Sequence, residues 1–170
     1  MTTIDEIRHA IDVLLDDGCD RLTVLQCCSG YPTPIVDANL AALATIRDTL
    51  HVATGWSDHT ASPAVLYRAV HRWGASLVEF HLDLDGTGDE FKAGHCWLPG
   101  QIAPVIAAIR DGERADGDGV KVPQGSELAD RAWRREPSDG LRPTLAMREA
   151  WKQLCPEQRS SQKGKLIKRN

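Results

Sequence analysis

The sequence lacks three features, each of which would assign the chain to a broad class of protein. No apolar run approaches the roughly 20 residues that a membrane-spanning helix requires, so we expect no contact with a membrane. The first six residues (MTTIDE) lack the basic and then apolar pattern of a signal peptide, and the cytoplasm is therefore the expected compartment. A net charge of -4 lacks the positive excess of a general nucleic-acid-binding protein, so no nucleic-acid partner is expected.

Cysteine is present, but its arrangement is not that of a disulfide framework or of a structural zinc site. The five cysteines are an odd number, and no two of them form a CxxC pair. We therefore expect reduced thiols.

Short apolar runs alternate with helical patterns along the first 110 residues. Residues 22–27, 51–56 and 76–80 are short and mostly apolar, which favours strands covered on both faces. Single helices between these strands indicate parallel βαβ units, because a parallel neighbour is reached only by a crossover. The fold class is therefore α/β, with parallel strands and flanking helices. The helices are indicated by apolar residues at helical spacing: Ile4, Ile7, Ile11 and Leu14; Leu40, Leu43, Ile46 and Leu50; Val65, Leu66, Ala69, Val70 and Trp73; and Ile102, Val105, Ile106 and Ile109.

The composition changes beyond these units. From residue 111 to residue 143 the chain is rich in Gly, Asp, Arg and Pro, and only residues 126–135 and 144–154 have helical patterns. The last residues are basic and polar, as in a solvated tail. We therefore expect a barrel-like domain over residues 1–117, a C-terminal extension with short helices over 118–157, and a disordered basic tail over 158–170.

Polar residues follow each predicted strand, where the carboxyl ends of parallel strands converge on one face. Ser29 and Tyr31 follow the first strand, His59 follows the second, and His81 follows the third. Neutral imidazole is the commonest protein ligand for a divalent metal, and two histidines at adjacent strand ends can point at one centre. His59 and His81 are therefore candidate metal ligands.

Each of these residues also has a simpler interpretation. His59 can be a residue at a helix start that bonds to the backbone, and His81 can be an ordinary loop histidine. The turn after the first strand by itself explains Ser29 and Tyr31. Asp58 either orients the neighbouring imidazole or caps the following helix.

One further pair of possible ligands, His95 and Cys96, is adjacent in the sequence. Imidazole and thiolate are suitable ligands for soft metals, but adjacent residues chelate one ion only in an unusual loop. We therefore expect a structural role for both.

Three segments together resemble the N-acetylneuraminate (sialic acid) synthase family: residues 25–34 (LQCCSGYPTP), 55–60 (GWSDHT) and 74–81 (GASLVEFH). The second of these, Gly-aromatic-Ser-Asp-His-Thr, is the most specific. The resemblance covers residues 1–117 and implies a partial (β/α)8 TIM-type barrel, about the last three βα units. The length agrees, because 170 residues fall short of the about 250 that a complete barrel needs.

The resemblance implies condensation of phosphoenolpyruvate with an N-acyl amino sugar, such as N-acetylmannosamine, to give a nonulosonic acid and phosphate. It implies that His59 and His81 are catalytic and hold Mn2+ or Mg2+, which acts as a Lewis acid on the sugar aldehyde. It further implies that Ser29 and Ser57 lie near phosphoenolpyruvate. The same matching places Tyr31 near the sugar.

The sequence also departs from the family pattern. Phe80 stands where family members usually have Lys before the second histidine. Residues 83–90 replace a segment that usually contains Pro-Gly-Pro-Asp, which makes Asp89 the match for the sugar-binding aspartate, and Cys28 replaces a frequent Thr. These changes are typical of a divergent branch with a different sugar.

The family's first strands, which would supply lysines for the phosphates, have no counterpart in this sequence. The expectation is therefore a subunit or fragment that requires a complementing N-terminal half or forms a homo-oligomer. Two alternatives are a non-catalytic remnant or scaffold of the family and a different nonulosonate synthase or metal-dependent aldolase.

Overall fold

The computed structural model describes residues 1–154. The tail predicted over residues 158–170 lies outside them. The chain divides into two compact units, Met1–Asp118 and Gly119–Asn170. Among the described helices, none combines the length and the apolar composition needed to cross a membrane.

Unit 1 is built on one parallel sheet in the order β1-β2-β3-β4. The strands are β1 (Thr23–Cys27), β2 (Ala53–Asp58), β3 (Val78–Leu82) and β4 (Cys96–Trp97). The first three confirm the predicted strands, each beginning within two residues of its expected start. The fourth strand was not predicted, because two residues are too few to carry a periodic pattern.

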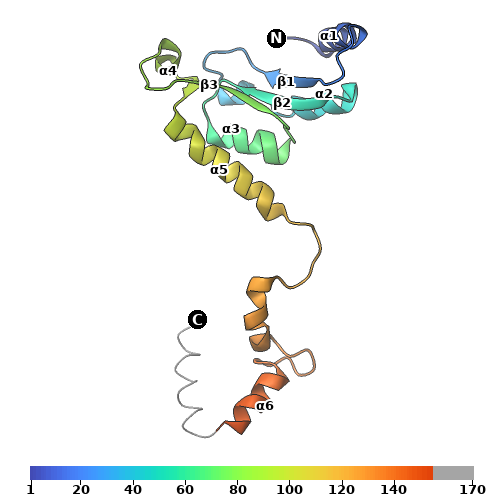
Figure 1. Cartoon of the computed structure of the whole chain (residues 1–170), viewed down its shortest axis with the longest axis vertical. Coiled ribbons are helices and arrows are strands. Elements are labelled where there is room, and N and C mark those ends of the chain that lie inside the picture. Colours follow the sequence, from blue (N-terminus) through green and yellow to red (C-terminus); the bar gives the residue numbers. More distant parts are fainter. Residues whose placement is uncertain (155–170) are drawn as a thin grey trace. The chain divides into compact units, whose positions relative to one another are not determined.

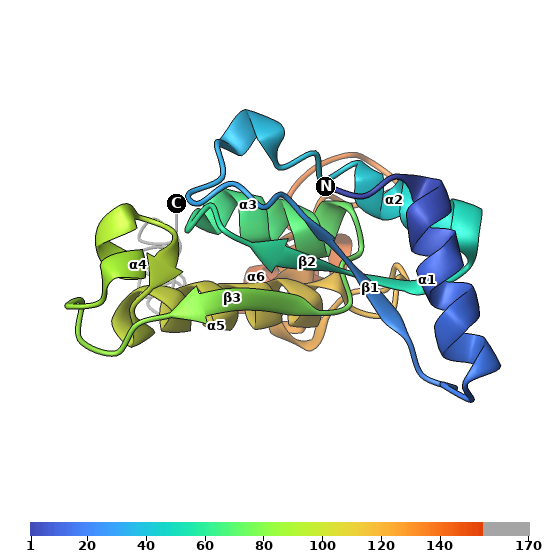
Figure 2. The same cartoon turned by 90° about the horizontal axis from the view of Figure 1, so that it is seen from above.

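Figure 1 shows α3 (green) and α5 (yellow) beneath the strands, and Figure 2 shows both helices behind them. The two helices therefore cover the same face of the sheet. α3 continues directly into η2, a π-helical turn. The helices of this unit are α1 (Ile4–Asp16), η1 (Ile35–Asp37), α2 (Ala42–Leu50), α3 (Pro63–Tyr67), η2 (Arg68–Arg72), α4 (Asp89–Ala93) and α5 (Pro99–Asp116).

The hydrophobic core lies between the sheet and these helices. Trp56 of β2 and Trp97 of β4 are buried against Leu66 of α3 and Ile102 of α5. Because successive side chains of a strand point to opposite faces, the positions next to these tryptophans face away from the helices. The paired residues on that opposite face, called the inner face from here on, are Cys27 with Ser57, Ser57 with Glu79, and His81 with Cys96.

Gly55 of β2 lets β1 and the residue just before β3 approach closely on its two sides. A Cβ atom at this position would lie 2.5 Å from the carbonyl oxygen of Leu77 and 2.5 Å from a methyl carbon of Leu25. Real Cβ atoms do not approach backbone oxygens so closely, so the sheet requires glycine here.

We expect the substitution Gly55→Ala to lower the free energy of unfolding by about 1–3 kcal/mol, because the backbone at Leu77, just before β3, must shift to admit the methyl group. The matched control is Gly100→Ala in α5, where no atom lies within 4 Å of the added Cβ. This control should leave stability unchanged or raise it by up to about 1 kcal/mol, because alanine favours helix. Urea unfolding followed by circular dichroism measures both, and equal midpoints for the two variants would contradict the argument.

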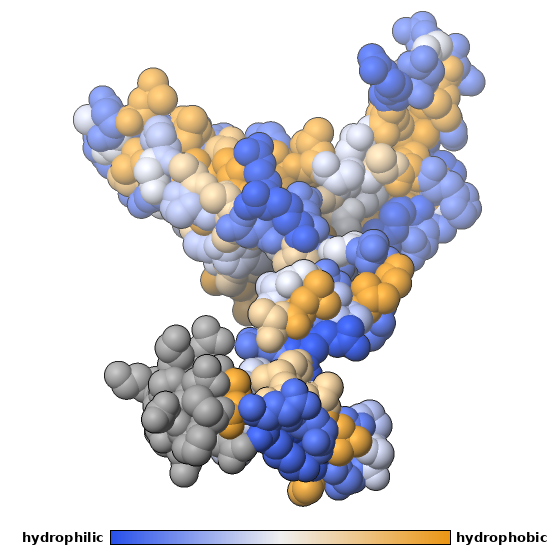
Figure 3. Space-filling view, turned by 60° about the horizontal axis from the view of Figure 1, so that its bottom comes forward, coloured by the Kyte–Doolittle hydropathy of each residue, from blue (hydrophilic) through white to orange (hydrophobic). Residues whose placement is uncertain are grey.

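The edge of the sheet at β1 is incompletely covered. A cavity of about 700 Å3 opens between α1, β1 and α2, lined by apolar residues that include Ile7, Ile11 and Val24. On α1, Val13 and Leu15 are 54% and 52% exposed. Hydrophobic residues (orange) also reach the molecular surface in Figure 3. Within residues 1–154, β1 is therefore an edge strand that lies beside exposed apolar side chains.

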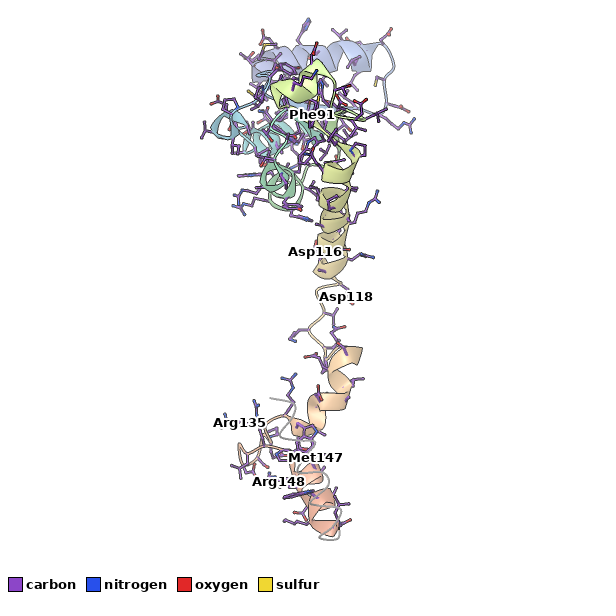
Figure 4. All side chains as sticks on the ribbon, turned by 90° about the vertical axis from the view of Figure 1, so that its left-hand side faces the viewer. Phe91, Asp116, Asp118, Arg135, Met147 and Arg148 are labelled. Atoms are coloured by element: carbon purple, nitrogen blue, oxygen red, sulfur yellow. The ribbon has the colours of Figure 1, made fainter. Side chains whose placement is uncertain are left out.

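Unit 2 contains two short helices in its described part, η3 (Gly125–Trp133), a 3-10 helix, and α6 (Leu145–Gln153). The hydroxyl of Thr144 donates to the carbonyl oxygen of Ala132 at 3.0 Å and so joins them. Arg148, labelled in Figure 4, forms an ion pair with Asp139 at 2.5 Å. Both segments that were predicted to be helical are therefore helical.

Candidate metal-binding site

His59 follows β2 and is buried, with 3% of its surface exposed. Its Nδ1 lies 3.0 Å from the carbonyl oxygen of Cys28. A carbonyl oxygen only accepts hydrogen bonds, so Nδ1 carries the proton in the neutral ring and Nε2 keeps its lone pair. The backbone contact therefore orients the ring and leaves one nitrogen available as a ligand.

His81 lies near the carboxyl end of β3, and its Nδ1 lies 3.0 Å from Oε2 of Glu90 in α4. The hydrogen bond from His81 is the main cause that lowers the pKa of Glu90, and the charge of His81 lowers this pKa further. The carboxylate of Glu90 is therefore in direct contact with the His81 ring.

The two predicted histidines come together, with ring centroids 5.0 Å apart. Tyr31, from the loop after β1, stacks beside them, with its centroid 4.2 Å from that of His59 and 5.9 Å from that of His81. A third histidine, His95, lies 5.3 Å from His81 and 5.1 Å from Tyr31. The rings of three histidines and one tyrosine are therefore grouped together.

His95 is the residue that sequence reasoning did not place in the site. It is 4% exposed, and neither ring nitrogen has a hydrogen-bond partner within residues 1–154. Its neighbour Cys96 is also buried and donates through Sγ to Oε2 of Glu90 at 3.7 Å. Burial is the main cause that raises the pKa of the Cys96 thiol, and the charge of Glu90 adds to it.

The loop between β3 and α4 is organised by Asp83. Its carboxylate accepts hydrogen bonds from the backbone nitrogens of Gly86 and Gly88, both at 2.9 Å. The bonds from Gly86 and then Asp85 are the largest causes that lower the pKa of Asp83. Phe91 of α4, labelled in Figure 4, lies against Gly86. The loop therefore has a defined conformation that carries Glu90 to His81.

One group of possible metal ligands includes His81 but not His59. His81, Glu90, His95 and Cys96 each offer one ligand atom, and these four atoms lie within 4.8 Å of one another. The structure therefore contains a potential metal-binding group in which His81 was predicted and the other three residues were not.

The residues predicted to contact substrates take different positions. Ser57 is buried on the inner face, and its hydroxyl donates to the carboxylate of Glu79. Ser29 Oγ lies 3.8 Å from the sulfur of Cys27, which itself is 3.9 Å from Nδ1 of His59. Both serines therefore lie on the side of the sheet that carries the histidines.

Asp89 does not join this arrangement in the structure. It is exposed at the start of α4, where its carboxylate lies 3.7 Å from Nζ of Lys92. The side chain that reaches His81 is that of the next residue, Glu90. The sequence offered no signal to distinguish these two neighbouring carboxylates.

Asp58 neither bonds to the His59 ring nor caps α3, but is buried among aromatic side chains. Its two carboxylate oxygens accept hydrogen bonds from the indole nitrogens of Trp56 and Trp97, each at 3.1 Å. It also accepts from the backbone nitrogen of Thr60 at 3.1 Å and from the Thr60 hydroxyl at 2.7 Å. Asp58 thus fixes the turn that follows β2 and carries His59.

These features define a segment of a parallel α/β barrel with histidines at the carboxyl ends of adjacent strands. The family model described as NeuB family matches residues 1–121, and the chain belongs to this family. The resemblance seen in the sequence is thereby confirmed.

Named relatives agree with this assignment. The N,N'-diacetyllegionaminic acid synthase of Campylobacter jejuni is 34% identical over 131 residues, which cover 75% of this chain and 38% of the relative. The N-acetylneuraminate-9-phosphate synthase of Mus musculus is 29% identical over 130 residues, 76% of this chain and 35% of the relative. Both relatives are sugar acid synthases by name.

A solved structure shows the same fold. The N-acetylneuraminic acid (sialic acid) synthetase of Leptospira borgpetersenii is similar with a TM-score of 0.63 and 26% identity, over 76% of this chain and 45% of that one. The chain thus spans less than half the length of each of these three proteins.

Proposed function

We propose that this chain is a subunit or fragment of a nonulosonate synthase that condenses phosphoenolpyruvate with an N-acyl hexosamine, such as N-acetylmannosamine, and releases phosphate. The observation that carries the proposal is the 5.0 Å separation of the His59 and His81 rings at the ends of adjacent parallel strands. Both histidines lie within residues 1–121, which match a family whose named members include sugar acid synthases, and this supports the proposal.

The donor atoms of this pair fit a divalent cation. His59 has Nδ1 engaged with a backbone carbonyl, so its Nε2 is a neutral nitrogen ligand that is already oriented. Mn2+ or Mg2+ bound by His59 and His81 would polarise the aldehyde of the amino sugar. His59 and His81 are the proposed catalytic residues in this sense.

The remaining proposed contacts use hydroxyl and carboxylate groups around the histidines. Tyr31 stacks on His59 and is 53% exposed, so it can contact a sugar that enters from solvent. Ser29 and Ser57 are proposed to hydrogen bond to phosphoenolpyruvate. Asp89 is proposed as a sugar contact that requires α4 to move, because its side chain is now exposed beside Lys92.

The cations for phosphoenolpyruvate must come from elsewhere. The paired inner-face positions Cys27, Ser57, Glu79, His81 and Cys96 include no lysine or arginine. Phosphate and carboxylate groups need such cations in a partly desolvated site. We therefore propose that a complementing N-terminal half, in a hetero-complex or within a homo-oligomer, completes the barrel at the open edge of β1.

The test is complementation. We expect the purified chain with Mn2+, phosphoenolpyruvate and N-acetylmannosamine to form little product by itself. Co-purification with the N-terminal half of the Campylobacter jejuni relative should raise product formation at least tenfold, measured by mass spectrometry of the sugar acid and by phosphate release. The same complex carrying His59→Ala is the control. Absence of any gain with N-terminal halves from several relatives would refute the proposal.

A second candidate is a non-catalytic remnant that keeps the partial barrel. It is favoured by Phe80, which stands in β3 where family members usually carry a lysine. Calorimetric titration with Mn2+ distinguishes the two. Mn2+ binding that is lost in both His59→Ala and His81→Ala supports the synthase, whereas no binding, or binding unaffected by both substitutions, supports the remnant.

A further inference from the structure

We propose that the segment after β3 forms a second metal site on His81, in which Glu90, His95 and Cys96 are the other ligands. The chemistry of this ligand set selects a borderline cation such as Zn2+ over Mg2+. The site goes beyond the proposed function, which uses His59, and shares only His81 with it. From here on it is called the loop site.

The separations between ligand atoms match those around a single ion. Ligand atoms bound to zinc at about 2.0–2.3 Å in tetrahedral geometry lie about 3.3–3.6 Å apart. Oε2 of Glu90 lies 3.0 Å from Nδ1 of His81 and 3.7 Å from Sγ of Cys96. All four ligand atoms fall within 4.8 Å of one another, so small side-chain rotations bring them onto one ion.

His95 gives the independent observation that a ligand belongs here. It is 4% exposed, and both ring nitrogens lack a hydrogen-bond partner in the described part of the chain. Burying a polar nitrogen without a partner is unfavourable, and native structures rarely leave two on one ring. A metal ion coordinated by one of these nitrogens removes that penalty and explains why the ring faces His81 at 5.3 Å.

The ligand types determine the class of metal. Two imidazoles, one thiolate and one carboxylate form a mixed set that suits Zn2+, whereas Mg2+ takes oxygen ligands in octahedral geometry. His81 uses Nδ1 for the loop site, because this is the nitrogen that faces Glu90. A neutral imidazole has one nitrogen lone pair for a metal, so His81 holds either the loop-site ion through Nδ1 or the ion shared with His59 through Nε2, and not both at once.

Cobalt spectroscopy on the full chain tests the loop site. After treatment with a chelator, titration with Co2+ should give a near-ultraviolet thiolate-to-cobalt charge-transfer band and visible bands of tetrahedral intensity. Stoichiometric Zn2+ should abolish both bands, and a hundredfold excess of Mg2+ should not. Absence of the charge-transfer band in the wild-type chain overturns the proposal.

Variants assign the ligands. Cys96→Ser should abolish the charge-transfer band, while Cys19→Ser, at a cysteine that bonds to the carbonyl of Arg21, should retain it. His95→Asn should weaken Co2+ binding at least tenfold. Glu90→Gln should do the same without a folding defect, because the Glu90 side chain is 65% exposed.

His59→Ala separates this proposal from the proposed function. It should leave the cobalt spectrum unchanged, although it should abolish the activity of the complemented enzyme. A charge-transfer band that persists in Cys96→Ser, or that disappears in His59→Ala, overturns the loop site. Failure of complementation together with an intact thiolate band leaves the loop site supported and refutes only the synthase.

Discussion

Replacing Asp58 with alanine is expected to lower the free energy of unfolding by about 2–6 kcal/mol, because two buried indole N–H groups lose their acceptor at about 1–3 kcal/mol each. The carboxylate is fully buried, as are Trp56 and Trp97 to within 3% exposure. The alanine would leave both indole N–H groups without an acceptor in the core. It would also remove the acceptor that fixes Thr60 at the turn before α3.

Asp58→Asn is the matched variant, because it keeps the shape and the Oδ1 acceptor. Its amide would point an N–H group at the indole of Trp97, so we expect a smaller loss of about 1–3 kcal/mol. A double-mutant cycle with Trp97→Phe isolates this contact, since the cost of Asp58→Asn should shrink once the indole N–H is gone. Denaturant unfolding measures all four proteins. A loss below about 1 kcal/mol for Asp58→Ala would show that the network contributes little.

Replacing His81 with alanine is expected to have the largest effect on function. His81 is the one histidine shared by the pair with His59 and by the loop site. Its loss should therefore weaken Mn2+ binding and remove cobalt binding at the loop site. It should also lower the rate of the complemented synthase by about 10^3-fold or more, since Lewis-acid stabilisation is worth several kcal/mol.

The matched control for His81→Ala is His9→Ala, which removes an exposed histidine from α1. It should leave both metal binding and complemented activity unchanged. Calorimetry with Mn2+, cobalt absorption and initial rates give three separate readouts. If His81→Ala and His9→Ala behave alike in all three, neither metal proposal survives.

Much of the fold could be predicted from local sequence patterns. Apolar residues at helical spacing predicted α1, and the structure adds a capping box at its start, in which Thr3 and Glu6 make both hydrogen bonds. Pro63 lies in the first turn of α3, the position that its fixed backbone angle favours. Ser62 is the N-cap residue, although its side chain makes no capping hydrogen bond. Such signals act over three or four residues, so they need no knowledge of the tertiary structure.

The segment between β3 and α5 was the part that local patterns did not describe. No helix or strand was predicted in this segment, which is rich in Gly and Asp, yet it contains α4 and β4. Both elements are too short for a periodic signal, and β4 exists because it pairs with His81 and Leu82 of β3. That pairing joins residues that are 15 positions apart, so it depends on how the loop folds back.

The sequence by itself determined the parallel α/β class, the family and the convergence of His59 with His81, because the carboxyl ends of parallel strands always meet on one face. Only the tertiary structure determined that Glu90 rather than Asp89 contacts His81, and that Asp58 accepts hydrogen bonds from two indoles. The same holds for the burial of His95 with no hydrogen-bond partner in the described part of the chain. The physical reason is that burial and hydrogen-bond partners are set by contacts between distant segments. Such contacts produce no periodic pattern in the sequence of the residues that make them.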